Sequence, residues 1–201
     1  MVKYGSMSKG ADTKDLILRT ALDFASRCGL EALSIGELAK KVGMSKSGLF
    51  GHFNSKEKLQ MMVLDYAAND FVQAVLLPAY KEPRGIPRIE ATVANWYRWI
   101  EKQHSGGCPF VAAAFEYDDR PGQVQDHLRL HLSTMINSFA TSANIAVEEG
   151  HFRKGIDSKE FAYRFYSYLL GLHLYSKLLK DNKAFDYHKH SFEDLLANYK
   201  A

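Results

Sequence analysis

The fold of this chain is decided by residues 34–53, which read SIGELAKKVGMSKSGLFGHF. Ser34 and Glu37 have the spacing of a capping box, which predicts that a short helix begins here. Gly43 can adopt the positive φ that ends a helix, and Ser45 is a second N-cap residue. The stretch therefore predicts two short helices joined by a tight turn, a helix-turn-helix.

The start of the second short helix suits a contact with nucleic acid. Ser45, Lys46 and Ser47 place two hydroxyls and one ammonium beside free backbone amides, a set that binds phosphates and base edges. In helix-turn-helix proteins this end of the second helix enters the major groove first. A helical hairpin inside a bundle is the alternative, and the geometry favours DNA binding over it.

Outward from this motif, the apolar residues recur with a helical period almost everywhere. Before the motif we expect a helix from Asp12 to Gly29, in which Cys28 is the last residue of the buried apolar stripe. After the motif we expect a helix at about 55–77, followed by a linker that starts at Pro78. Further helices are expected at about 86–104, 109–117, 121–150, 158–180 and 185–199. No segment alternates like a strand. The predicted fold is all-α, with about nine helices: an N-terminal helix-turn-helix domain (1–58) followed by a C-terminal helical bundle (59–201).

Composition and charge bound the class of protein. The chain has 201 residues, of which 46% are hydrophobic and 24% charged, a balance that excludes disorder, and no apolar run could span a bilayer. Residues 1–60 carry ten Lys/Arg against six Asp/Glu, and 61–201 carry sixteen against seventeen. A basic first part suits an anionic partner, although a charge of this size alone decides nothing. Without a hydrophobic signal core, we expect a cytoplasmic protein with reduced cysteines.

Residues 12–60 resemble the DNA-binding domain of the TetR (tetracycline-repressor-like) family of bacterial regulators. Three stretches carry the resemblance: ALDFA at 21–25, GLEALSIGELAKKVGMSKSGLFGHF at 29–53 and SKEKL at 55–59. The rest is similar in chain length and in the layout of its helices. In addition, GGCPF at 106–110 and DDRPG at 118–122 are similar to a subset of the family.

The resemblance implies a sequence-specific DNA-binding regulator of transcription, a homodimeric repressor that a small molecule releases from double-stranded operator DNA. It places seven residues at positions that face DNA: Ser34, Ser45, Lys46, Ser47, Phe50, His52 and Lys56. Of these, His52 and Lys56 match phosphate contacts, and Lys46 and Ser47 match positions that can reach bases. The family usually has tyrosine at Phe50, so here only the apolar face of that side chain remains.

The aromatic residues that follow residue 60 are expected to surround a small-molecule effector. In this family the C-terminal bundle encloses a ligand cavity, and stacking walls favour a flat or hydrophobic ligand. The candidate ligand-binding residues are Tyr66, Trp96, Trp99, Phe110, Phe115, Tyr117, His131, Phe139, Tyr168 and His173. Ordinary bundle core is the alternative for the same aromatic side chains. The helix that starts at Ser55 would carry the response to the DNA-binding domain.

The last two helices are expected to form the dimer. A helix that is apolar nearly all round is buried on both sides, and two such pairs can build a four-helix bundle across a two-fold axis. The candidate interface residues are Phe161, Phe165, Leu169, Leu172, Phe192, Leu195, Leu196 and Tyr199.

Two other features of the sequence could carry chemistry. Cys108 precedes Pro109 at a helix start, where backbone amides could make it a redox or electrophile sensor, but a packed thiol is favoured. His127 and His131 lie one helical turn apart, yet no Cys or acidic residue stands at a ligand spacing, so no metal or cofactor is expected. The chain has no phosphate loop and no serine elbow, so it is not expected to be an enzyme. A helical enzyme or small-molecule-binding protein that uses the motif only structurally is the rival class.

Overall fold

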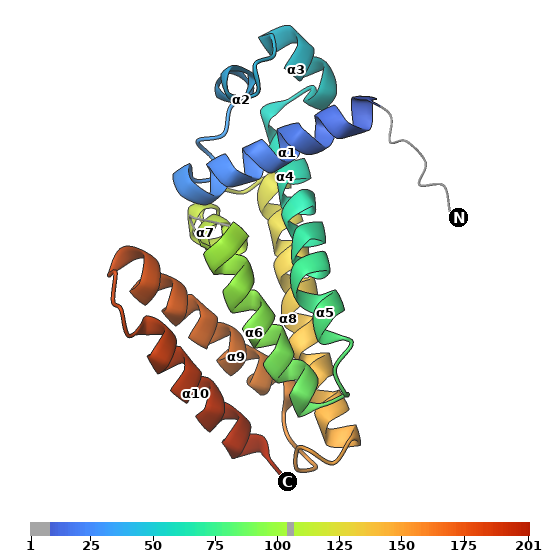
Figure 1. Ribbon diagram of the computed structural model, residues 1–201, viewed down its shortest axis with the longest axis vertical. Helices are drawn as coiled ribbons and strands as arrows, with labels where there is room; N and C mark the ends of the chain where they lie inside the picture. The colour runs from blue at the N-terminus through green and yellow to red at the C-terminus, as the bar shows by residue number, and fades with distance from the viewer. Residues whose placement is uncertain (1–8, 104–106) are drawn as a thin grey trace, which may run out of the picture.

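The computed structural model describes residues 9–103 and 107–201, and these are predominantly helical (Figure 1). The helices are α1 (Lys9–Cys28), α2 (Ile35–Val42), α3 (Lys46–Phe53), α4 (Lys56–Phe71), the π-helical turn η1 (Val72–Leu76), α5 (Leu77–Ala79), α6 (Ile86–Gln103), α7 (Pro109–Glu116), α8 (Gln123–Glu148), α9 (Ser158–His173), the π-helical turn η2 (Leu174–Leu178) and α10 (Ala184–Tyr199).

The expected all-α fold is confirmed. One continuous helix runs from α4 through η1 to α5, and another runs from α9 through η2, so nine helices result for the described part of the chain. The described residues form no strand, and one isolated antiparallel bridge joins Phe152 to Lys200. The expected end of a helix near His104 lies outside the described residues.

Four local expectations differ from the structure. The first helix begins at Lys9, before Asp12. Cys28 is exposed, because it lies in the last turn of α1. The third difference is at Pro78, which continues the helix to Ala79. Proline lacks an amide hydrogen, and the preceding turn widens to the π-helical η1, a common response to a residue that breaks the helical hydrogen-bond ladder.

The start of α8 also lies later than expected. Gly122 has a φ of 145°, a conformation that favours glycine, so the helix begins at Gln123 and Pro121 stays in the preceding loop.

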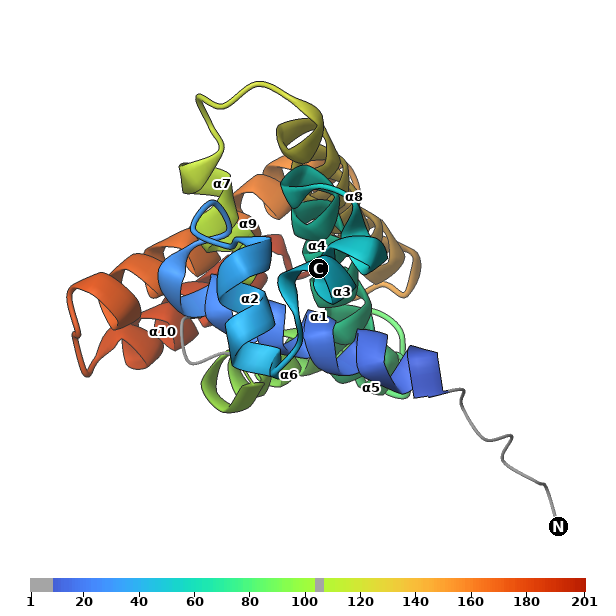
Figure 2. The same cartoon turned by 90° about the horizontal axis from the view of Figure 1, so that it is seen from above.

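The helices form two connected regions, a small group at one end of the molecule and a longer bundle. α1, α2 and α3 gather at one end of the molecule, and α4 leaves that end and runs beside α8 (Figures 1 and 2). α8 also packs on α9, which packs in turn on α10. The described residues contain no helix long and apolar enough to cross a membrane.

Candidate DNA interface, domain junction and ligand cavities

The α2–α3 pair has the capping geometry that the sequence predicts. The Ser34 hydroxyl accepts a hydrogen bond from the amide of Glu37 at 3.2 Å, and the Ser45 hydroxyl accepts one from Gly48 at 3.1 Å. Between the helices, Gly43 has a φ of 70°. Leu49, on the inner side of α3, has no exposed surface. Local hydrogen bonds and one buried face therefore fix the orientation of α3.

The outer side of α3 is polar and open. Ser45, Lys46, Ser47 and His52 are exposed, and the Phe50 ring keeps 49% of its surface exposed. Ser34 is half-buried at the start of α2. The structure therefore brings five of these candidates onto α3 and its N-cap, and it places Ser34 at the start of the neighbouring helix α2.

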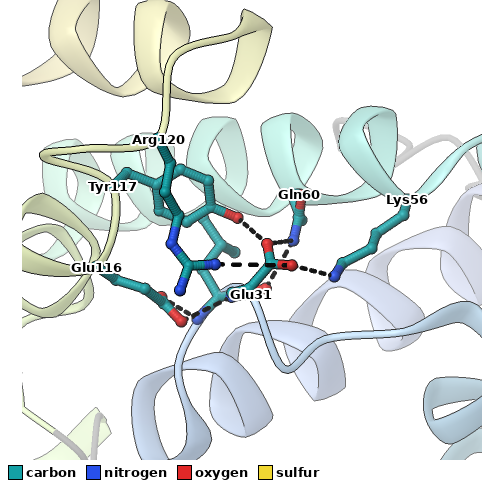
Figure 3. Close-up of polar contacts among 7 residues, drawn as sticks. Glu31, Lys56, Gln60, Glu116, Tyr117 and Arg120 are labelled. Atoms are coloured by element: carbon teal, nitrogen blue, oxygen red, sulfur yellow. Dashed lines mark hydrogen bonds and ion pairs between the residues drawn. The ribbon is translucent and has the colours of Figure 1, made fainter.

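The seventh candidate, Lys56, has a partner within the chain. Its Nζ lies 2.7 Å from the Glu31 carboxylate, which also accepts from the Tyr117 hydroxyl at 2.9 Å and lies 3.8 Å from Arg120 (Figure 3). Gln60 completes this group and donates to the Leu30 carbonyl oxygen at 2.9 Å. The hydrogen bond from Lys56 holds the pKa of Glu31 below its ordinary value, against the effect of burial.

Glu116, at the end of α7, belongs to the same group of contacts, which we call the domain junction: Glu31, Lys56, Gln60, Glu116, Tyr117 and Arg120. The Glu116 carboxylate accepts hydrogen bonds from the amides of Leu30 at 2.7 Å and Glu31 at 3.0 Å. The segment between α1 and α2 is thus fastened to α7 and to the loop before α8 (Figure 3). Among these residues, the sequence singled out Lys56, Tyr117 and the DDRPG stretch that contains Arg120, but it assigned no role to Glu31, Gln60 or Glu116.

Several aromatic ligand candidates lie in a packed core. Trp96 and Trp99 each have 1% of their surface exposed, and their rings lie 4.8 and 5.3 Å from Phe71. Phe139 lies 5.8 Å from the Trp96 ring. The indole nitrogen of Trp99 donates to Asp70 at 2.7 Å. These rings pack in the core of the bundle, and Phe71, which contacts both Trp rings, also lines a neighbouring cavity.

That cavity lies between the continuous helix α4–η1, α7 and α8. It has a volume of about 120 Å³, and Phe110 and His131 are the two ligand candidates that reach it. The remaining walls are mostly apolar: Ala68, Phe71, Val72, Leu76, Thr134, Met135 and Ser138.

A second hollow of about 340 Å³ lies between α9 and α10. Tyr168 lines it, together with Leu172 and His188. Burial lowers the pKa of His188 to about 4, so this imidazole is neutral at ordinary pH.

The other four ligand candidates lie apart from both hollows. The Tyr66 hydroxyl donates to Asp15 of α1 at 3.1 Å, and Tyr117 belongs to the junction described above. Phe115 is 65% exposed on α7, and His173 is half-buried near the end of α9. The ten candidates are therefore divided among the packed core, the two hollows, the domain junction and more exposed positions.

The expected dimer residues are internal to the chain. Phe161, Phe165, Leu169, Leu172, Phe192, Leu195, Leu196 and Tyr199 are all buried, because they join α9, α10 and α8 to one another. The exposed apolar side chains of the same region are Tyr163, Leu174, Tyr175, Leu178, Leu179 and Tyr187.

Cys108 is 2% exposed, and burial raises the pKa of its thiol to about 11. A thiol with this pKa stays protonated near neutral pH, and the thiolate is the reactive form. The geometry therefore favours the packed thiol over the redox sensor.

Comparison with known proteins decides the class. The model of the family described as bacterial regulatory proteins, tetR family, matches residues 17–60, and the model described as tetracyclin repressor-like, C-terminal domain, matches residues 85–192. The chain belongs to the TetR family. It is a DNA-binding transcriptional regulator, as the α2–α3 motif predicted.

Solved structures share this fold. A TetR transcriptional regulator from Chloroflexus aurantiacus is 21% identical, with a TM-score of 0.82 over 95% of this chain and 96% of that chain. AibR, solved in complex with isovaleryl coenzyme A and operator DNA, is 20% identical, with a TM-score of 0.65 over 80% of this chain and 85% of that chain. Among curated proteins, the nucleoid occlusion factor SlmA of Marinomonas sp. is 23% identical over 74% of this chain and 73% of its own length.

Proposed function

We propose that this TetR-family protein is a homodimeric repressor that a small apolar molecule releases from its operator in the bacterial cytoplasm. Residues 1–58 would read DNA, and residues 59–201 would bind the effector and a second copy of the chain. The rival enzyme class has less support, because no catalytic arrangement is needed to account for the geometry of α3 or of the cavity beside α4. AibR, a relative in fold, was solved with both an acyl coenzyme A and operator DNA.

DNA binding is assigned to the exposed face of α3. Lys46 stands at the N-terminal end of this helix, next to the Ser45 cap, where backbone amides favour anionic groups. Lys56 stands at the start of α4, which two residues separate from α3, and forms an ion pair with Glu31 at 2.7 Å. A phosphate that attracts Lys56 would compete with Glu31, so DNA binding and the state of the junction would be coupled.

The observation that carries the effector proposal is the cavity beside α4. Its volume of about 120 Å³ is smaller than the roughly 300–1,000 Å³ of typical small-molecule sites. A ligand larger than a few atoms therefore fits only if α4–η1 moves away from α8. Only two residues separate α4 from α3, so this movement shifts the recognition helix. Such a ligand prefers one of the two arrangements, which is the condition for a shift in operator affinity.

The dimer is assigned to the exposed apolar residues at the end of α9 and η2. Leu178 is 74% exposed and Leu179 is 56% exposed, on the same stretch as Tyr175. A second copy that covered them would remove a contiguous apolar surface from water. Leu178→Glu should give a monomer in analytical ultracentrifugation, whereas Leu130→Glu, at a residue 63% exposed on α8, should leave a dimer. A wild-type chain that sediments as a monomer at micromolar concentration would overturn this assignment.

The DNA proposal is tested with an operator selected from random duplexes. Lys46→Ala should weaken binding and relax the base preference by about 1–3 kcal/mol. Lys56→Ala should weaken all sequences alike and reduce the salt slope by about one. Lys189→Ala, an exposed lysine on α10, is the control and should keep the wild-type affinity. If Lys46→Ala and Lys56→Ala both behave like the control, α3 is not the DNA-binding helix.

The effector proposal is tested by filling the cavity. Hydrophobic compounds that raise the melting temperature are first selected and then titrated against the protein–operator complex. Ser138→Leu, in the cavity wall, should abolish the effect of these compounds on operator affinity and retain DNA binding. Thr141→Leu, one turn further along α8 on an exposed face, should respond like wild type. Compounds that bind without changing operator affinity would refute release by a ligand.

A further inference from the structure

Three metal-ligating side chains converge between α4 and α8. The Nε2 atoms of His127 and His131 lie 2.6 and 2.9 Å from the same oxygen, Oδ1 of Asp65, and 3.3 Å from each other. The histidines stand one turn apart on α8, and Asp65 projects from α4. The sequence suggested only the histidine pair, because the third group is 62 residues away from His127 in the chain.

We propose that Asp65, His127 and His131 form a binding site for a divalent transition metal of the zinc class. Two imidazole nitrogens and one carboxylate oxygen are a donor set that Zn²⁺ accepts, and Co²⁺ binds such sites as well. The set differs from the oxygen-only ligands that Mg²⁺ and Ca²⁺ prefer.

The distances fit such an ion. Ligand atoms bonded to a tetrahedral metal at about 2.0–2.1 Å lie roughly 3.3–3.4 Å from one another. The two Nε2 atoms already have this separation, at 3.3 Å. The carboxylate oxygen has to withdraw by about half an ångström to reach the same geometry. The side chain of Asp65 is 55% exposed and therefore has room to do so.

The surroundings leave space for a fourth ligand. The side chains of His127 and His131 are 26% and 22% exposed, so the site lies at the surface with its histidines partly enclosed. The His131 ring lies 6.0 Å from Phe110, which holds it on its inner side. Three protein ligands and water at the open position are a common arrangement for zinc. The alternative is that Asp65 and the histidines only form hydrogen bonds with one another, and the experiment must separate this from metal binding.

Metal binding would fasten α4 to α8 at the third turn of α4. The same two helices must separate to enlarge the cavity described above, and His131 lines both the cavity and the metal site. A bound ion would thus favour the closed arrangement. Its consequence for operator affinity rests on the proposed function, whereas metal binding itself does not.

The experiment uses the full chain, without added histidines, after removal of metal with a chelator. Zn²⁺ is titrated by calorimetry, and Co²⁺ by its visible absorption. We expect one ion per chain and, for Asp65→Asn, His127→Gln and His131→Gln, an affinity lower by at least about tenfold. His190→Gln, an exposed histidine on α10, is the matched control and should bind like wild type. Far-ultraviolet circular dichroism checks that each variant is folded. If a histidine variant does not fold, the affinity of Asp65→Asn, which changes the most exposed of the three ligands, decides the outcome.

Hydrogen exchange tests the link between the helices. Zn²⁺ should slow exchange of the amides around Asp65 in wild type and leave them unchanged in Asp65→Asn. The proposal is overturned if wild type binds no Zn²⁺, if Asp65→Asn binds as well as wild type, or if His190→Gln loses as much affinity as His127→Gln. In each of those cases the cluster is only a hydrogen-bonded group of side chains. Because no measurement here involves DNA, a failure of this proposal is distinct from a failure of the repressor proposal.

Discussion

The α2–α3 pair and the junction around Glu31 both adjoin the segment between α1 and α2, yet they are held by contacts of different range. In the pair, each capping hydroxyl bonds an amide three residues away. At the junction, Glu116 bonds the amides of Leu30 and Glu31, which lie 86 and 85 residues away. The first region is built by neighbouring residues, whereas the second exists only once the bundle has formed. The difference suggests that the recognition motif stays rigid while its attachment to the bundle is the part that can change.

The largest effect should come from the core of the rigid region. Leu49 has no exposed surface, so Leu49→Ala leaves a cavity between α2 and α3 and should lower the free energy of unfolding by about 2–5 kcal/mol. The measurement is urea unfolding followed by circular dichroism. Phe50→Ala, at the next residue, removes a side chain that is 49% exposed and should change the midpoint little. Equal midpoints for Leu49→Ala and wild type would show that α3 is not held by this core.

The next largest effect should come from the junction. Glu116→Ala removes the acceptor of two half-buried backbone amides, and because water can reach these donors in part, the total cost should be about 1–3 kcal/mol. The amides of Leu30 and Glu31 should exchange faster, while those of α3 should not. Glu193→Ala, an exposed carboxylate on α10, serves as the control. Faster exchange in α3 as well would mean that the two regions unfold together, which would remove the distinction drawn above.

Sequence reasoning succeeded where contacts are local and failed where they are not. The caps at Ser34, Ser45 and Ser55 follow from residues at a spacing of three, so the helix starts could be predicted. The carboxylate of Asp65 beside His127 could not, because the packing of α4 on α8 brings them together.

Burial at helix ends was equally hard to predict. Cys28 continues an apolar stripe but lies where α1 ends in solvent. His188 belongs to the polar sequence HKH at 188–190, yet it is buried in α10 and contacts the Tyr97 hydroxyl. The rings that lie against His188 belong to Tyr97 of α6, Tyr168 of α9 and Phe192 of α10, and no local pattern reveals the contacts with α6 and α9.

A smaller effect is expected from a single cap. Ser45→Ala leaves the amide of Gly48 without its acceptor and should destabilise the protein by about 1 kcal/mol. Ser47→Ala, whose hydroxyl contacts only the Ser45 hydroxyl among the described hydrogen bonds, should have less effect. Thermal unfolding of the two variants gives the comparison. A larger loss in Ser47→Ala would mean that the cap is not what starts α3.

The smallest effect should be the pH dependence of the junction. Lys56 lowers the pKa of Glu31 in the folded protein, so the folded value lies below the unfolded value of about 4.3. The stabilisation from Glu31 is therefore fully present above the unfolded pKa and is lost as the pH falls through the folded pKa. Because the Glu31 side chain is 40% exposed, solvent screening should keep this contribution under about 1 kcal/mol. Glu31→Gln carries no titrating group, so the difference in unfolding free energy between wild type and this variant should be constant from pH 7 to about pH 5 and shrink below that. If the two proteins lose stability in parallel down to pH 3, the ion pair with Lys56 contributes nothing to stability, and the junction is held by its other hydrogen bonds, including those of Glu116 and Gln60.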